Sequence, residues 1–304
     1  MNRWLILFFF AFTFLEAKPP EKLKRYNLSI CALFRNEEKY LREWIEYHRL
    51  IGVNHFFLYN NRSTDSYYRI LYPYLRAGLV TLIDWPGIPG NRTNDEPFIW
   101  PLSTQVTAFE NAVKLVAGRQ TKWLAILDVN EFLVPTYTKT LTELLDKYDS
   151  YPGVIIASDY FDSSKDSLPK RTLLIETVEM TNPPVSPIER EVTKMIFKPN
   201  LCTTFSWPPY RCNFKDDEQP IAAKESDFTD TPPVQPKAEI KINRYVNRGL
   251  YFHGKIKPKI HLDNRLLSTQ EVTEILNENY EIEDQESPIR RFIPQLKKNL
   301  GVHE

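Results

Sequence analysis

Residues 27–158 alternate short apolar runs with amphipathic segments, and this alternation constrains the fold more than any other feature of the chain. Short apolar runs bounded by turn residues predict buried strands, whereas apolar residues spaced three and four apart predict helices. Strands that alternate with helices of this length form a mostly parallel sheet, because each crossover returns the chain in the same direction. The sequence therefore predicts an α/β domain with a mostly parallel, mixed sheet flanked by helices.

The expected elements differ on the two sides of residue 158. Before it we expect strands at residues 28–33, 55–59, 79–83, 123–127 and 154–157, and helices at residues 38–51, 66–77, 103–116 and 141–148. After it we expect strands at residues 172–178, 192–197 and 238–243, a polar loop at residues 215–237, and helices at residues 271–278 and 287–300. His48 lies on the apolar face of the first helix, so we expect a core residue rather than a ligand.

Several expected strands end in polar residues, and in an open α/β sheet ligands bind at the edge where such strand ends meet. The residues concerned are Arg35, Asn36, Glu37, Asn60, Asn61, Asp65, Asp84, Asp128, Asn130 and Glu131. The carboxylate and amide oxygens at residues 128–131 suit Mg²⁺ or Mn²⁺. The side chains at residues 36–38 and 63–65 also have a simpler reading, because they are suited to cap the helices that follow.

Composition excludes several classes of protein. The chain has only nine glycines and contains neither G-x-G-x-x-G nor G-x-x-x-x-G-K-[ST], so a dinucleotide-binding fingerprint and a P-loop are absent from the sequence. A sugar-nucleotide-forming nucleotidyltransferase is disfavoured for a similar reason, because residues 33–38 contain no glycine. Lys plus Arg and Asp plus Glu both number 39, and this balance argues against a nucleic-acid partner.

The N-terminus resembles a targeting segment. Arg3 precedes an apolar run at residues 4–15 that is shorter than the ~20 residues needed to span a bilayer. We expect residues 1–17 to be a signal peptide, with a short membrane anchor as the alternative. The chain then enters the secretory or export pathway, as an exported protein if the segment is cleaved or a single-pass, Golgi-type membrane protein if it is retained.

Cys202 and Cys212 are ten residues apart and are suited to close a disulfide loop, while Cys31 lies in an expected strand.

Two sequence blocks carry a family resemblance. CALFRNEEKYLREWIEYHRLIGVNHFFLYNNRSTDSY, followed by WLAILDVNEFLVP, resembles glycosyltransferase family 92, once called domain of unknown function 23. The match is strong over residues 28–135 and weaker beyond, and N-E-E with a later S-T-D also resembles family 2 glycosyltransferases. The resemblance implies a GT-A-like (nucleotide-diphospho-sugar transferase) fold, which we place at residues 27–260. Within it, the polar and Pro-rich residues 215–237 are expected to form a flexible loop, and the helical patterns beyond it predict a C-terminal helical extension at residues 261–304.

The resemblance also implies an activity and a site. It suggests a hexosyltransferase that moves galactose or another hexose from a UDP-sugar to a glycan or other hydroxyl acceptor with inversion, aided by Mn²⁺ or Mg²⁺. Arg35, Asn36 and Glu37 match the family's nucleotide pocket, and Asp84 ends the third strand beside it. Asn60, Asn61 and Asp65 match the loop that meets base and ribose, and Asp128, Asn130 and Glu131 match the metal motif.

The chain departs from the family pattern at two positions. Asn130 stands where the family usually has Asp, and Arg244 stands where it has His. Arginine cannot ligate a metal, but its guanidinium can bind a diphosphate by paired hydrogen bonds. We hypothesise that Arg244 partly replaces the metal ion. The alternative functions are a non-catalytic member that binds nucleotide or glycan, and an exported host-interaction protein on the same scaffold.

The catalytic base is the least determined part of the predicted site. Asp159 and Asp162 follow the fifth expected strand, and Glu189 and Glu191 lie in the segment after it; any of them is suited to deprotonate an acceptor hydroxyl. At least two of the four are expected to be solvated loop carboxylates. Trp207 and Tyr210 are candidates for stacking on a sugar, or for a rigid turn that packs on the sheet.

Overall fold

The computed structural model describes residues 26–86, 102–117, 120–162, 172–176, 180–181, 194–206, 211–222, 238–246, 261–262, 265–266 and 287–302. The predicted targeting segment 1–17 and the predicted helix 271–278 lie outside these residues, as do Glu189, Glu191, Trp207 and Tyr210. Among the helices that the structure describes, none is both long and apolar enough to cross a membrane.

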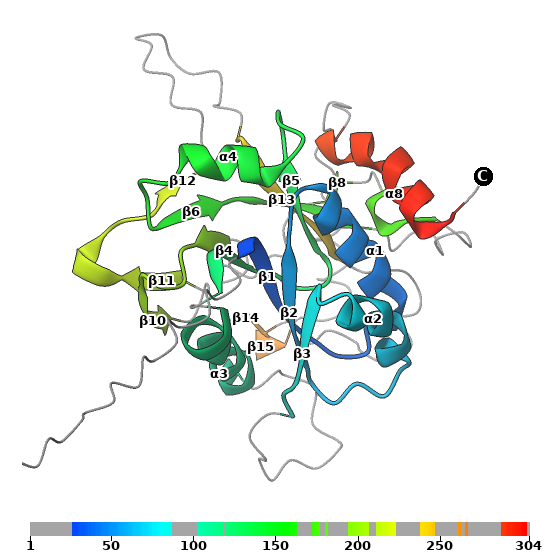
Figure 1. Ribbon diagram of the computed structural model, residues 1–304, viewed down its shortest axis with the longest axis horizontal. Coiled ribbons are helices and arrows are strands. Elements are labelled where there is room, and N and C mark those ends of the chain that lie inside the picture. The colour runs from blue at the N-terminus through cyan, green and yellow to red at the C-terminus, as the bar shows by residue number, and fades with distance from the viewer. Residues whose placement is uncertain are drawn as a thin grey trace, which may run out of the picture.

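The main sheet has seven strands in the order β12-β6-β9-β4-β1-β2-β3 (Figure 1). The strands are β1 Tyr26–Phe34, β2 His55–Asn60, β3 Val80–Asp84, β4 Thr121–Ile126, β6 Gly153–Ile156, β9 Lys194–Phe197 and β12 Ile221–Ala222. Neighbouring strands run parallel except at β9, which is antiparallel to both β4 and β6. The predicted mostly parallel α/β sheet is therefore confirmed.

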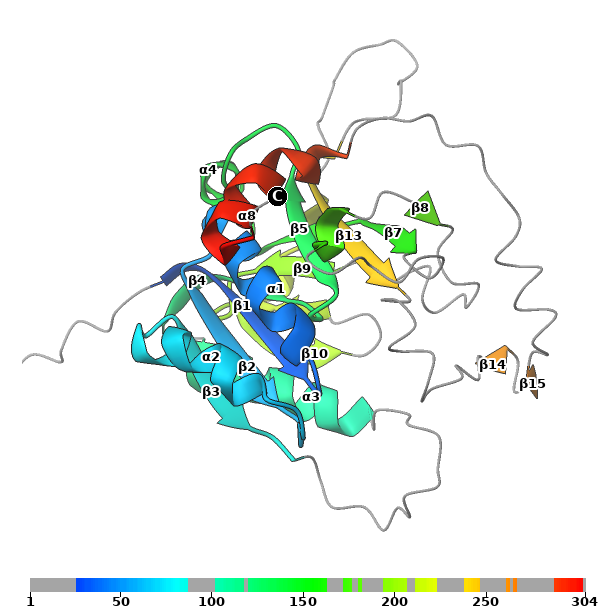
Figure 2. The same ribbon diagram turned by 90° about the vertical axis from the view of Figure 1, so that its right-hand side faces the viewer.

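Helices cover both faces of this sheet. The helices are α1 Glu38–Leu50, α2 Tyr67–Arg76, α3 Leu102–Asn111, α4 Leu141–Lys147 and α8 Ile293–Leu300. α1, α2 and α8 lie together over one face, and α3 lies on the other (Figure 2). A π-helical turn, Ala112–Ala117, follows α3, and a 3₁₀ turn, Pro288–Phe292, precedes α8. The predicted helices of the N-terminal half are all present, with ends that shift by a few residues.

Strand β1 shows why the sheet is buried on both faces. Its residues alternate between two hydrophobic clusters: Ile30 and Ala32 join the cluster under α1, whereas Cys31 and Leu33 join the cluster under α3. Successive side chains of a strand point to opposite faces, so a continuous apolar run fills both cores. Burial also raises the pKa of the Cys31 thiol. Such a sheet leaves polar chemistry to its edges.

A second, four-stranded sheet has the order β5-β13-β7-β8. Its strands are β5 Glu131–Pro135, β7 Ser158–Asp162, β8 Met180–Thr181 and β13 Ile240–Val246. Strands β5 and β7 lie beside β13 and were not among the strands expected from the sequence. Two short hairpins complete the described strands, β10 Cys202–Ser206 with β11 Arg211–Phe214, and β14 His261–Leu262 with β15 Arg265–Leu266.

The strand predicted at residues 172–178 is wrong over its described part, which forms a 3₁₀ turn at Leu174–Glu176. The carboxylate of Glu43 on α1 accepts the backbone N–H groups of Leu174 and Ile175, at 2.9 and 3.1 Å. These two amides are therefore unavailable to a strand ladder. The polar loop predicted at residues 215–237 also contains the 3₁₀ turn Lys215–Asp217 and strand β12 in its described part.

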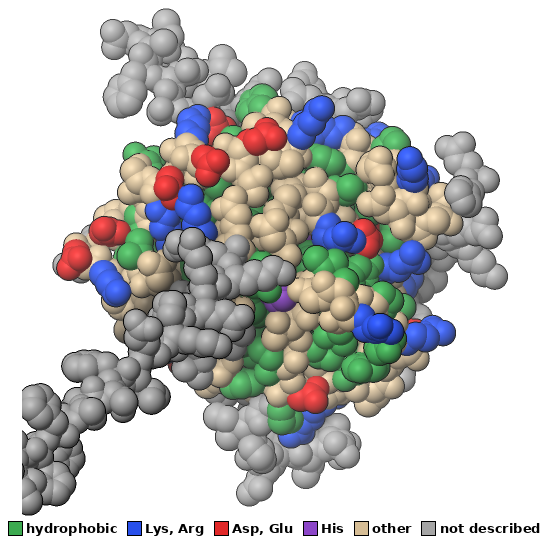
Figure 3. Space-filling model, in the orientation of Figure 1, with side chains coloured by type: hydrophobic (Ala, Val, Ile, Leu, Met, Phe, Trp, Pro, Cys, Tyr) green, Lys and Arg blue, Asp and Glu red, His purple; other side chains and the backbone are tan. Residues whose placement is uncertain are grey.

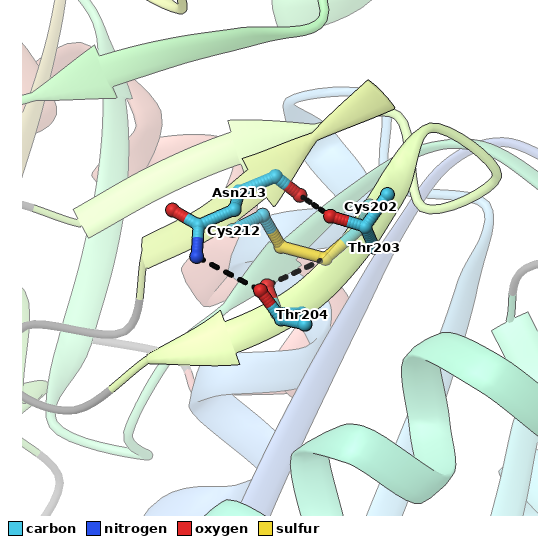
Figure 4. Close-up of a disulfide and its surroundings, with 5 residues drawn as sticks. All are labelled: Cys202, Thr203, Thr204, Cys212 and Asn213. Atoms are coloured by element: carbon cyan, nitrogen blue, oxygen red, sulfur yellow. Dashed lines mark hydrogen bonds between the residues drawn. A yellow bond between two sulfur atoms is a disulfide. The ribbon is translucent and has the colours of Figure 1, made fainter. Parts of the chain in front are cut away.

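The Cys202–Cys212 disulfide joins β10 to β11 (Figure 4). Side-chain hydrogen bonds flank it: the Thr203 hydroxyl donates to the carbonyl oxygen of Asn213 at 2.9 Å, and the Asn213 amide donates to the Thr204 hydroxyl at 2.8 Å. Cys212 and Phe214 pack in the cluster under α3. The bridge therefore anchors the hairpin that covers this face of the sheet.

His48 is a core residue, as predicted. It is fully buried, its Nδ1 lies 2.8 Å from the carbonyl oxygen of Trp44, and its Nε2 accepts the N–H of Leu133 at 3.3 Å. These partners require a neutral ring with the proton on Nδ1. Burial lowers the pKa of His48 to about 3.

Candidate functional site

The loops that follow β1 and β2 hold each other at the carboxyl edge of the sheet. Asn36 has a left-handed backbone, with φ of 56°, and its side-chain oxygen accepts the N–H of Thr64 at 2.7 Å. In return, the N–H of Asn36 donates to the Ser63 hydroxyl at 3.0 Å. Asn tolerates this backbone region better than most residues. Arg35 and Glu37 flank it in the same loop and are both partly exposed.

Two carboxylates link the starts of α1 and α2. The carboxylate of Asp65 accepts the N–H of Glu38 at the start of α1, at 2.7 Å. The carboxylate of Glu38 accepts the N–H of Ser66 just before α2, at 2.9 Å. Carboxylates at helix starts satisfy orphan amide groups and complement the helix dipole. The capping alternative is therefore confirmed for Asp65, whose other oxygen accepts the N–H of Tyr67 at the start of α2 at 3.4 Å. Glu38 instead accepts an amide of the next loop and makes no capping bond to its own helix.

Asn60 ties the ends of β2 and β3 together. The sheet register aligns Phe34, Asn60 and Asp84 across three neighbouring strands. The Asn60 amide donates to the Asp84 carboxylate at 3.0 Å and to the Tyr67 hydroxyl at 2.9 Å, and its oxygen accepts the N–H of Ser63. The neighbouring Asn61 is buried and donates its backbone N–H to the Phe34 carbonyl oxygen. All the predicted nucleotide-binding residues of these loops thus share one edge.

Four charged residues form a second group at the end of β4, which we call the charged cluster: Asp128, Glu131, Lys194 and Arg244. The Lys194 Nζ lies 3.1 Å from Glu131 Oε2 and 3.7 Å from Asp128 Oδ2. The Arg244 guanidinium lies 3.7 Å from Glu131 Oε1 and 4.0 Å from Asp128 Oδ2. Each carboxylate therefore faces both cations. The cluster combines two acidic and two basic groups, so its formal charge is zero.

Strand pairing explains how these residues meet. Because β9 is antiparallel to β4, its first residue, Lys194, arrives at the edge where β4 ends. Arg244 on β13 lies directly opposite Glu131 on β5. The Glu131 backbone is held in turn by the Trp44 indole, which donates to its carbonyl oxygen at 2.8 Å. Residues from four separate parts of the chain thus converge on the turn after β4.

Burial differs sharply within the charged cluster. The Glu131 side chain is 0% exposed and that of Lys194 is 2% exposed, whereas Asp128 and Arg244 retain 28% and 21%. Glu131 Oε2 also accepts the N–H of Asp128 at 2.8 Å. Buried charges persist only when they are paired, so Glu131 and Lys194 form the inner layer of the cluster. Asp128 and Arg244 form its outer layer.

Asn130 serves the backbone of this turn. Its amide nitrogen donates to the carbonyl oxygen of Tyr245 at 3.0 Å, and its own carbonyl oxygen accepts the N–H of Tyr245 at 2.9 Å. These two bonds join the turn after β4 to the end of β13. Asn130 thus has a structural role, for which its side-chain nitrogen is needed as a hydrogen-bond donor.

The charged cluster does not fit a divalent cation as it is arranged. Asp128 and Glu131, the carboxylates of the predicted metal motif, already face Lys194 and Arg244 at 3.1–4.0 Å. A metal ion bound to the same oxygens would meet two like charges, each worth about 4 kcal/mol of repulsion per unit charge at about 4 Å and a dielectric constant of 20. Over the described ranges, no group of three His, Cys, Asp or Glu residues is placed to hold a metal ion.

The candidates for the catalytic base do not gather at the charged cluster in the described part of the chain. The Asp159 carboxylate binds Lys241 Nζ at 3.0 Å. Asp159 pairs with Asn243 and Tyr160 with Arg244 in the ladder of β7 and β13, so Asp159 lies on the opposite face of this sheet from Arg244. Asp162 ends β7 opposite Val246. Glu189 falls outside the described residues.

Lys194 is the site residue that sequence reasoning missed. It opens a strand, Lys194–Phe197, in which every residue is buried. The sequence held one signal for Lys194: a lysine in a short apolar strand must have a charged partner, since lysine is almost never buried without one. The missing information was the partner, because only the pairing of β9 with β4 brings Lys194 to Asp128 and Glu131.

Solved structures resemble this chain only distantly. Staphylococcus aureus TarS, residues 1–349, matches at 14% identity and a TM-score of 0.33, over 58% of this chain and 48% of that one. Glucosyl-3-phosphoglycerate synthase from Mycobacterium tuberculosis, in complex with Mn²⁺, UDP and glucosyl-3-phosphoglycerate, matches at 14% identity and a TM-score of 0.34, over 60% of this chain and 61% of that one.

Sequence relatives are more informative. A glycosyltransferase family 92 protein of Oryza sativa subsp. japonica is 30% identical over 145 residues, which cover 44% of this chain and 22% of the relative. One of Arabidopsis thaliana is 27% identical over 204 residues, which cover 62% of this chain and 32% of the relative. The chain thus spans about a third or less of the length of the curated relatives it matches. The family model of glycosyltransferase family 92 matches residues 24–217, more than half of the 304 residues, and the chain therefore belongs to glycosyltransferase family 92.

Proposed function

We propose that the chain transfers a hexose from a nucleotide-sugar donor to a hydroxyl group of a glycan or other glycoconjugate. One observation carries this proposal: in a family 92 chain, the polar ends of β3, β2, β1 and β4 meet at a single edge of a sheet buried on both faces. Ligands of open α/β sheets bind at this edge. The interlocked loops after β1 and β2 supply amides, carboxylates and a guanidinium, the groups that recognise a base and a ribose.

In this proposal the donor is a UDP-sugar, with galactose as the sugar and inversion at the anomeric carbon. The nucleoside lies against the loops at residues 35–37 and 60–65, and the diphosphate lies toward the charged cluster. A carboxylate takes the proton from the acceptor hydroxyl while the oxygen of that hydroxyl attacks the anomeric carbon. The bond to the acceptor oxygen forms as the bond to the diphosphate breaks, and the nucleoside diphosphate leaves.

A thermal-shift panel tests this proposal. The full chain is heated with UDP-, GDP- and other nucleotide-sugars, each with and without Mn²⁺. A ligand at 100 times its dissociation constant stabilises the folded state by about 2.7 kcal/mol, so a bound UDP-sugar raises the melting temperature by several degrees. No shift with any nucleotide would overturn the proposal. A shift without measurable donor hydrolysis or transfer would instead favour the non-catalytic alternative.

We also propose that the chain folds in the secretory pathway. The paired Cys202 and Cys212 support this, because disulfides persist in oxidising compartments. On the face shown in Figure 3, the described acidic and basic side chains are interspersed. Expression in a eukaryotic cell, followed by N-terminal sequencing, tests the proposal: a new N-terminus near residue 17 indicates a cleaved signal peptide, and retention of residue 1 in a membrane fraction indicates an anchor. A chain found in the cytosol would contradict both forms.

A further inference from the structure

The charged cluster contains two cations, Lys194 and Arg244, at the edge where the diphosphate of the proposed donor would lie. We propose that Lys194 and Arg244 take the place of a divalent cation, so that this chain binds the diphosphate of its nucleotide donor without a metal ion. The inference rests on the proposed function, because it concerns how the same donor is held. It assigns a role to Lys194, a residue that sequence reasoning did not select.

The charge balance of the cluster matches that of a metal site. A divalent cation held by two carboxylates gives a site of zero formal charge. Asp128 and Glu131 reach the same balance with one ammonium and one guanidinium, at 3.1–4.0 Å. A metal ion added to this group would leave an excess of two positive charges beside a buried lysine. The fold therefore already holds the positive charge that a diphosphate requires.

The layering of the charged cluster gives its two cations different roles. Lys194 is 2% exposed and lies under the turn, between Glu131 and Asp128, so it acts as a positioning residue. Arg244 is 21% exposed and lies over the Tyr160 ring, with its guanidinium carbon 5.8 Å from the ring centre. A guanidinium presents paired donors that match phosphate oxygens. Arg244 is thus the group that meets the diphosphate.

The two sheets hold Lys194 and Arg244 in place, because both residues lie on strands. Lys194 opens β9 and Arg244 lies within β13, where it faces Glu131 in the ladder. Asn130 fixes the intervening turn to the next residue of β13, Tyr245. Cations placed on rigid elements need no reorganisation when an anion binds.

The test measures UDP binding to the full chain by calorimetry, in EDTA and then in excess Mn²⁺. If the inference holds, coupling between Mn²⁺ and UDP is close to zero and the two affinities agree within about two-fold. Binding that collapses in EDTA and returns with Mn²⁺ would overturn the inference while leaving the proposed function intact. Absence of UDP binding in both buffers would instead overturn the proposed function, and the inference with it.

Variants then assign the roles. Arg244→Met is expected to weaken UDP binding on the order of 10- to 100-fold in EDTA, the equivalent of one or two charge-assisted hydrogen bonds. Arg244→Lys keeps the positive charge but loses the paired N–H donors of the guanidinium, so we expect a loss of UDP affinity between those of wild type and Arg244→Met. The matched control is Lys122→Met, which removes a lysine of β4 that pairs with Asp149 at 3.1 Å near the amino end of the strand. Wild-type affinity in Arg244→Met would overturn the role of Arg244.

Lys194 needs a paired variant, because removing it alone leaves the buried Glu131 with only Arg244, 3.7 Å away, as its cation and endangers folding. The double variant Lys194→Met with Glu131→Gln removes both charges together. It is expected to unfold cooperatively and to bind UDP at least about ten-fold more weakly than the wild type in EDTA. A folded double variant with unchanged affinity would remove Lys194 from the inference. If this variant does not fold, the EDTA comparison and the Arg244 variants still decide the question of metal replacement.

Discussion

Asn130 holds the turn after β4 through its amide nitrogen, which donates to the Tyr245 carbonyl oxygen at 3.0 Å. The variant Asn130→Asp restores an Asp-x-Asp sequence, yet it places a carboxylate oxygen against a carbonyl oxygen. We expect it to lower the free energy of unfolding by about 1–3 kcal/mol, the cost of a lost and mismatched hydrogen bond. We also expect no gain in Mn²⁺ binding, because Lys194 and Arg244 keep their places beside Asp128.

Urea unfolding checks the stability change, and calorimetric titration with Mn²⁺ checks metal binding. The matched control is Asn54→Asp, because the Asn54 side-chain oxygen accepts the N–H groups of Asn27 and Leu28 and a carboxylate keeps this role. This control is expected to change stability by less than about 0.5 kcal/mol. A stable Asn130→Asp variant that binds Mn²⁺ tightly would show that Asn130 is a weakened metal ligand after all.

The same residues show what sequence alone can predict about the site. Asp128, Asn130 and Glu131 were located correctly at the end of β4, because an apolar run that stops at polar residues is a local signal. Their partners gave no such local signal: Lys194 was missed, and Arg244 was assigned to the site only through the family resemblance. Lys194 and Arg244 lie 63 or more residues further along the chain, since 194 − 131 = 63. They meet the turn only through the registers of β9 with β4 and of β13 with β5, which no local pattern encodes.

Helix α1 carries two buried groups that respond to pH in opposite directions. Burial raises the pKa of Glu43 to about 7, although the N–H groups of Leu174 and Ile175 partly oppose the shift. The stability that this group contributes is complete below about pH 4.5 and is lost as pH rises to 7. Burial lowers the pKa of His48 to about 3, so its contribution is complete above pH 6.5 and is lost as pH falls. Between pH 4.5 and 6.5 the two effects offset each other.

The variant Glu43→Gln removes one of these effects. We expect its free energy of unfolding to rise with pH by about 2–3 kcal/mol more than that of the wild type between pH 4.5 and 6.5, since each pKa unit corresponds to about 1.4 kcal/mol. Urea unfolding at several pH values measures the slope. The complementary variant His48→Gln should show the reverse slope. Parallel pH profiles for wild type and Glu43→Gln would mean that Glu43 titrates normally.

At the scale of elements, prediction worked best where the pattern was long and periodic. Helix α1 and strands β1 and β2 were predicted to within about three residues. Two of the missed strands, β5 and β7, are only five residues long, and β7 also mixes polar with apolar residues. The wrong strand, at residues 172–178, failed because the side chain of Glu43, more than 120 residues earlier in the chain, captures its amides.

At the scale of the whole molecule, the Cys202–Cys212 bridge acts mainly on the unfolded chain. It closes a ten-residue separation, and the loop-entropy account gives about 2–3 kcal/mol for a loop of this size. We therefore expect the double variant Cys202→Ser with Cys212→Ser to lower the free energy of unfolding by about this amount, as measured by urea unfolding. The reference is the wild type in a strong reductant, which should match the variant. Equal stability of oxidised and reduced wild type would contradict this.

The hydrogen bonds of Glu38 and Asp65 have a mechanical consequence for the molecule. Asp65, in the loop after β2, accepts the first N–H of α1, and Glu38, the first residue of α1, accepts the N–H of Ser66 just before α2. If either loop lifts from the edge, a helix start in the other loses its hydrogen bond. The starts of α1 and α2 are therefore coupled, and we expect a nucleoside that displaces one of these loops to cost hydrogen bonds at the other.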